Sequence, residues 1–153
     1  QGYATPVPGD ARGRGFGEVL LDAAPLYGPL VQALQSAKVE LHYTAHITGH
    51  GWRKLMRAAQ PLSYVVERVP EVPAIYPMLC GAAGMDTRES YGTFNMGAGF
   101  AFFVAERDRE RALEVARKAG GELLHAGHVE AGPKRVVIQP LGIKFDGDSL
   151  QIR

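Results

Sequence analysis

The segment 45–52, which reads Ala-His-Ile-Thr-Gly-His-Gly-Trp, combines histidine, threonine and glycine in an order that could bind an anion. The residues before the turn, 39–47, are rich in Val, Ile, Tyr and Thr and indicate a strand. A strand that leads through a glycine-rich turn into a helix leaves the first N–H groups of that helix unpaired, at the positive end of its dipole. Such a corner can hold a phosphate, although two glycines alone indicate only a tight turn.

A helix is expected directly after this turn, over residues 52–59. Its apolar residues recur at helical spacing and form one face, made of Trp52, Leu55, Met56 and Ala59. Arg53, Lys54 and Arg57 lie on the same predicted helix, close to the glycine turn. Charged side chains on a helix normally face solvent, but near an anion-binding corner one of them could meet a phosphate, and we select Arg53 as that candidate.

Three histidines spaced by four residues, His42, His46 and His50, have the spacing of zinc ligands on one face of a helix. The surrounding residues are strand formers, however, and residues four apart on a strand lie about 13 Å from one another. That distance is too long for one metal ion, so the sequence predicts no metal site.

The composition is that of an ordinary globular domain. The chain has 153 residues, which suits one domain, with 46% hydrophobic and 22% charged residues. Its 17 basic and 16 acidic residues nearly balance, which argues against nucleic acid or an anionic membrane as a partner. Cys80 is the only cysteine, so no intrachain disulfide can form. No apolar run reaches membrane-spanning length and no leader opens the chain, so we expect a cytoplasmic protein.

Further helix and strand signals predict an α+β domain, with a mixed sheet of roughly four to six strands and helices packed on it. Asp86 and Glu89 have the spacing of a capping box at the start of a helix. The run 100–104 is apolar throughout and predicts a buried strand. The tail 143–152 alternates around Asp146-Gly147, a pattern typical of a hairpin.

Two more local features are expected. Asp108 should cap a helix whose inner face is made of Ala112, Ala116 and Ala119. Residues 1–17 contain five glycines and two prolines, which predicts a linker or a mobile N-terminus. Residues 18–153 would then form a single domain.

Two motifs resemble one enzyme family. The segment 46–51 resembles the His-Ile-Thr-Gly-Gly-Gly segment of aminoimidazole ribonucleotide synthetase, also called phosphoribosylformylglycinamidine cyclo-ligase. The segment 91–100, Tyr-Gly-Thr-Phe-Asn-Met-Gly-Ala-Gly-Phe, is similar to that family's Tyr-Arg-Thr-Phe-Asn-Met-Gly-Ile-Gly-Met. Both motifs occur in the family's order, and the resemblance runs from about Gly17 to Val137.

The resemblance implies a reaction and a set of site residues. In that family ATP activates the formyl oxygen of formylglycinamidine ribonucleotide, and an internal nitrogen then closes the imidazole ring. His46 would handle a proton or polarise that oxygen. The expected substrate-binding residues are Thr48, Gly49, His50, Gly51, Arg53, Asn95 and Gly97.

The resemblance covers only the C-terminal half of the family's enzymes. It therefore implies that ATP and magnesium are bound mainly by an N-terminal domain that this chain lacks, and we expect no cofactor and no turnover in the isolated chain. The implied partners are a small ribonucleotide substrate, the chain's own N-terminal domain and, in the full-length enzyme, a second copy in a homodimer.

Two alternatives remain open. The chain could be a diverged member of the wider superfamily of ATP-dependent synthetases and kinases with the same two-domain plan, or a non-catalytic module that binds a small molecule. The segment 93–97 favours the cyclo-ligase. Ala24, Pro25 and His50 depart from the family pattern and favour a loss of function.

Overall fold

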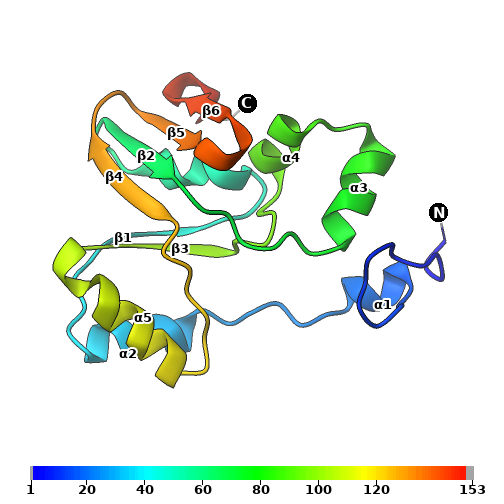
Figure 1. Ribbon diagram of the computed structural model, residues 1–153, viewed down its shortest axis with the longest axis horizontal. Coiled ribbons are helices and arrows are strands. Elements are labelled where there is room, and N and C mark those ends of the chain that lie inside the picture. Colours follow the sequence, from blue (N-terminus) through cyan, green and yellow to red (C-terminus); the bar gives the residue numbers. More distant parts are fainter. Residues whose placement is uncertain (1, 151–153) are drawn as a thin grey trace.

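The computed structural model describes residues 2–150, and it confirms an α+β fold with six strands in two sheets (Figure 1). In the two-stranded sheet, β1 (Leu41–His46) runs antiparallel to β3 (Phe100–Val104). The other sheet has four strands in the order β4-β2-β5-β6. Its strands are β2 (Leu62–Val66), β4 (Gly127–Ala131), β5 (Arg135–Ile138) and β6 (Ile143–Asp146).

The four-stranded sheet is mixed, as the sequence predicts. β2 pairs with β4 in the antiparallel sense and with β5 in the parallel sense, while β5 and β6 are antiparallel. β2 therefore lies between two strands that both come much later in the chain. Residues 63–66 of this central strand are all buried.

Five α-helices and four 3₁₀ helices complete the described part of the chain. The α-helices are α1 (Phe16–Leu20), α2 (Gly28–Ser36), α3 (Ile75–Ala83), α4 (Thr87–Thr93) and α5 (Arg109–Lys118). The 3₁₀ helices are η1 (Gly51–Arg57), η2 (Glu106–Asp108), η3 (Gln139–Leu141) and η4 (Gly147–Leu150).

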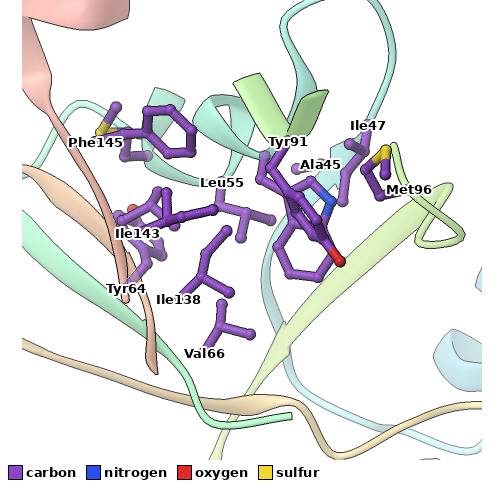
Figure 2. Close-up of a cluster of buried hydrophobic side chains, with 13 residues drawn as sticks. Ala45, Ile47, Leu55, Tyr64, Val66, Tyr91, Met96, Ile138, Ile143 and Phe145 are labelled. Carbon is purple, nitrogen blue, oxygen red and sulfur yellow. The ribbon is translucent and has the colours of Figure 1, made fainter. Parts of the chain in front are cut away.

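The main core lies between the four-stranded sheet, η1, α4 and the β1–β3 sheet (Figure 2). Its buried side chains include Leu55 from η1, Val66 from β2, Tyr91 from α4 and Phe145 from β6. A second, smaller cluster lies on the other side of the β1–β3 sheet, which α2 and α5 cover (Figure 1). The β1–β3 sheet therefore separates two apolar layers.

Two of the predicted helices have the expected local interactions. The capping box of α4 is confirmed, because Glu89 N–H donates to the Asp86 side chain at 2.7 Å and Asp86 N–H donates to Glu89 at 3.0 Å. In α5, Ala112 and Ala116 are buried. Ala119 is exposed, since the helix has already ended at Lys118.

Asp108 does not cap α5 through its side chain as predicted. Its carboxylate instead accepts the backbone N–H of Glu40 at 2.8 Å and pairs with Arg111. The hydrogen bond from the Glu40 N–H has the largest effect on the pKa of Asp108 and lowers it below its usual range. Arg111 lowers this pKa further, while desolvation opposes both effects. The buried carboxylate thus fastens the start of α5 to the entry of β1.

The tail and β3 also differ from prediction. Asp146-Gly147 does not turn into a second strand of a hairpin, because β6 pairs back onto β5 and the chain then enters η4. Ile152, the far end of the predicted hairpin, lies outside the described residues. The five residues of β3 are half-buried rather than buried, since the two-stranded sheet covers them less completely than a wide sheet would.

The described part of the N-terminal segment has a defined structure of its own. Arg14 forms ion pairs with Asp10 at 2.8 Å and with Asp22 at 2.6 Å, and Pro6 and Gly15 form an isolated bridge. Val7 is buried. An extended connection then leads from α1 to α2 (Figure 1).

Candidate functional site

His46 is the last residue of β1 and its side chain is exposed. Its imidazole stacks on the ring of Phe100 at 5.9 Å and meets the ring of Tyr27 edge-on, also at 5.9 Å. Tyr27 and Phe100 contact each other at 4.9 Å between ring centroids. The two aromatic rings position the histidine at the end of the strand while leaving it accessible.

A hollow of about 240 Å³ lies beside this strand. It is lined by Tyr43, Thr44, Ala45, His46, Lys54 and Arg57. The first four residues belong to β1 and the last two to η1, so the hollow forms where the helix passes the strand. Its polar groups are an imidazole, an ammonium, a guanidinium and two hydroxyl groups.

The charged side chains of this hollow are all cations. Within residues 2–150, neither Lys54 nor Arg57 forms an ion pair with a carboxylate, and Lys54 Nζ donates to Thr48 Oγ1. Desolvation, followed by the charge of Arg57, lowers the pKa of Lys54. Desolvation also lowers the pKa of His50, with further effects from Arg57, Arg53 and Lys54. The surroundings thus have an excess of positive charge that an anion would offset.

One backbone donor of the predicted anion-binding corner, the N–H of Gly51, is not available to a ligand. η1 is a 3₁₀ helix of seven residues rather than an α-helix, and Met56 interrupts it with non-helical dihedral angles. The N–H of Gly51 donates to the carbonyl of Thr48 at 2.7 Å, and Gly51 and Trp52 are buried. Because the N–H of Gly51 is already paired and covered by protein, it cannot receive a ligand without rearrangement, while binding at the other backbone donors of this turn stays a prediction.

His50, which stands where the family motif has glycine, is compatible with its backbone. Its φ is −114° and its ψ is 11°, a conformation that residues with a Cβ atom can adopt. Gly51 is the position in the turn that requires glycine. Its φ is +53°, and a Cβ atom there would lie 2.1 Å from the carbonyl oxygen of Tyr91.

The side chain of Arg53 is hydrogen-bonded within the fold. Its guanidinium donates to the carbonyl of Gly92 at 2.6 Å and 3.1 Å, to that of His50 at 3.3 Å and to that of Ser149 at 3.0 Å. These contacts tie η1 to α4 and η4. Arg53 therefore fits a structural role better than the phosphate contact predicted for it.

Asn95 and Gly97 are likewise used within the fold. The side-chain oxygen of Asn95 accepts the hydroxyl of Tyr76 at 2.9 Å and the N–H of Gly97 at 3.0 Å. Gly97 has φ of +97°, and a Cβ atom there would lie 2.4 Å from the carbonyl oxygen of Glu71. Both residues fix the turn before β3, as a turn-closing asparagine does, and their place in a cleft wall stays a prediction.

The two glycine-containing motifs do come together in space, as their shared resemblance to one family suggests. Trp52 Nε1 donates to the carbonyl of Asn95 at 2.8 Å, and the rings of Trp52 and Tyr91 lie 5.3 Å apart. The N–H of Ile47 donates to the carbonyl of Gly99 at 2.9 Å. The second motif therefore packs against the first one and helps to hold it in place.

The predicted residues separate into two groups. Thr48 and Gly49 are exposed and His50 is half-buried, close to His46, whereas Gly51, Arg53, Asn95 and Gly97 fix the turns. Sequence reasoning did not select Lys54, Arg57 or Tyr27. A signal for the two cations is present in the sequence, since residues 41–66 contain no Asp or Glu.

The described residues provide no metal site. In residues 2–150, no three His, Cys, Asp or Glu side chains lie close enough together to hold a metal ion. The donors around the hollow are nitrogen atoms and hydroxyl groups, a set that does not suit magnesium, which prefers carboxylate and phosphate oxygens. None of the described helices is long and apolar enough to cross a membrane.

Comparison with known sequences gives a consistent result. Residues 9–139 match the family described as AIR synthase related protein, C-terminal domain. A phosphoribosylformylglycinamidine cyclo-ligase of Methanothermobacter thermautotrophicus is 36% identical over 99 residues, which cover 65% of this chain and 29% of the relative. That of Methanosarcina mazei is 34% identical over 126 residues, with 82% and 37% covered. That of Lachnospira eligens is 30% identical over 132 residues, with 84% and 39% covered. The chain thus spans roughly a third of the length of these relatives.

A solved structure shares the fold. The crystal structure of E. coli HypE, a hydrogenase maturation protein, superposes with a TM-score of 0.57 at 18% sequence identity. The match covers 89% of this chain and 44% of the HypE chain. At this level of identity the likeness concerns the fold alone.

Proposed function

This chain belongs to the family of AIR synthase related proteins, whose C-terminal domain it contains, and from that membership we propose that it is the C-terminal domain of a phosphoribosylformylglycinamidine cyclo-ligase. The named relatives at 30–36% identity support this proposal. In the full-length protein the domain would contribute to ATP-dependent ring closure in purine biosynthesis, in the cytoplasm.

The observation that carries the proposal is the position of His46. Its imidazole is exposed at the end of β1, is held by Tyr27 and Phe100, and borders a hollow rich in positive charge. An exposed imidazole that is fixed in orientation can donate or accept a proton, and nearby cations suit a phosphorylated substrate. His46 would therefore act on the formyl oxygen or the attacking nitrogen, with the nucleotide's phosphate beside it.

ATP and magnesium would be bound mainly by the domain that precedes this one in the full-length protein. ATP supplies the phosphoryl group that activates the formyl oxygen, and the described residues of this chain offer no carboxylate cluster for the accompanying magnesium. This domain would orient the ribonucleotide and move the proton. The complete enzyme would be a homodimer in which each N-terminal domain packs against its own C-terminal domain.

A second candidate function is favoured by the departures from the family motif. His50 stands in place of a motif glycine, and Ala24 and Pro25 stand where the family has Thr and Arg. The backbone at His50 accommodates the change, so the turn keeps its shape with a different surface. This supports a diverged superfamily member that uses the same fold on another substrate, or a module that binds a small molecule without turnover.

The test is ATP-dependent formation of aminoimidazole ribonucleotide by a protein that includes the preceding domain. His46→Ala should lower turnover by roughly 10²- to 10⁴-fold, the usual contribution of a general acid or base, with little change in melting temperature. The matched control is His42→Ala, which removes an exposed histidine of the same strand that pairs with Glu40. A large loss of melting temperature with near-normal turnover in the His46 variant would assign His46 a structural role.

A further inference from the structure

The cationic hollow beside β1 has the features of an anion-binding site. Lys54 and Arg57 project from η1 toward the strand that carries His46, and the described residues supply no carboxylate to pair with either cation. Two cations that border one small space repel each other, and a bound anion would offset that repulsion. The arrangement therefore favours an anionic ligand.

The backbone of β1 adds hydrogen-bonding groups to the same space. Ile47 N–H donates to Gly99, so in this antiparallel pair the alternate residues Thr44 and His46 turn their backbone groups away from β3. β3 is the only strand that pairs with β1 in the described part of the chain. The outward N–H groups of Thr44 and His46 therefore lie along the free edge, where both residues line the hollow.

We propose that this hollow binds a phosphate group, with Lys54 and Arg57 as the charged contacts. The proposal rests on the proposed function, because it assigns the phosphate of the ribonucleotide substrate to a place in this domain. The charged contacts are then Lys54 and Arg57, in place of the backbone N–H groups and Arg53 that the sequence had indicated.

The alternative role for the two cations is protection of the strand edge. Lys and Arg beside an unpaired strand edge discourage pairing with a second chain. That role requires charge but no particular ligand, and it predicts self-association when the charges are removed. The experiment separates the two roles by measuring anion affinity and oligomeric state on the same variants.

The first measurement is the binding of sulfate to the 153-residue chain, monitored through the backbone amide signals of residues 41–57 in NMR spectra. Replacing both Lys54 and Arg57 by Ala should weaken binding at least tenfold. Arg117→Ala, which removes an exposed cation of α5, is the control and should change the affinity less than twofold.

The second measurement replaces sulfate with ribose 5-phosphate and with inorganic phosphate. Tighter binding of the sugar phosphate supports a nucleotide substrate, whereas equal affinity assigns the site to a free anion. If the double variant of Lys54 and Arg57 binds the anions as well as the wild-type chain does, and also dimerises, the proposal is overturned in favour of edge protection. Because these titrations use no ATP and no turnover, their failure is distinct from failure of the proposed cyclo-ligase activity.

Discussion

The two glycine-containing turns of this chain resemble each other in sequence and differ in what they expose. The turn after β1 leaves His46, Thr48 and Gly49 on the surface. The turn before β3 directs the oxygens of Asn95 inward to Tyr76, Gly97 and Trp52. Both turns contain a glycine at positive φ that lies close to another backbone, Gly51 beside Tyr91 and Gly97 beside Glu71. Only the turn after β1 also lies beside the cationic hollow.

The strongest test of this comparison is within the first turn itself. Gly51→Ala should destabilise the fold by about 3 kcal/mol or more, because the residue has positive φ and its new Cβ atom would collide with Tyr91. Gly49→Ala is the matched control, since a Cβ atom at Gly49 meets nothing within 4 Å. Urea unfolding of both variants measures the difference. Equal stabilities would show that Tyr91 and the turn can move apart at little cost.

An intermediate effect is expected in the second turn. Asn95→Ala removes the acceptor of the Tyr76 hydroxyl and of the Gly97 N–H, and should cost about 1–3 kcal/mol of unfolding free energy. The control from the exposed turn is Thr48→Ala, which loses one contact with Lys54 and should stay within about 0.5 kcal/mol. The comparison between the turns breaks down if Thr48 proves the more costly of the two.

The smallest effect separates two arginines of η1. Arg53→Ala should cost about 1–2 kcal/mol, since its guanidinium bonds to carbonyl groups of three separate segments. Arg57→Ala should leave stability within about 0.5 kcal/mol and act on anion binding instead. Chemical denaturation together with a sulfate titration on each variant gives both quantities. A binding loss confined to Arg53 would restore the role that the sequence suggested for it.

The sequence predicted the features that depend on nearby residues. The capping box of Asp86 and Glu89 spans three residues and was confirmed. The strand that ends at His46 was also found, because its side chains alone indicate β structure. Such features can be predicted because the interactions that cause them are made by neighbouring residues.

The features that the sequence did not predict depend on residues far apart in the chain. Arg53 bonds to carbonyls 39 and 96 positions away, so its pattern on the helix gave no sign that it would be unavailable to a ligand. Asp108 looked like a helix cap and is instead bound to the N–H of Glu40, 68 positions away. The Asp146-Gly147 pair looked like a hairpin turn, but β6 pairs with β5 and the chain continues into η4. In each case tertiary contact overrode a local preference.

The position of β2 has a consequence for how the chain is made. Both strands that flank β2 come from residues 127–138, which leave the ribosome about sixty residues after it. Until then the buried residues 63–66 form an apolar strand with two open edges, a state prone to pair with other chains. A polypeptide that stops before Gly127 should therefore aggregate rather than fold, and synthesis of the last strands should be the step that commits the domain to its native state.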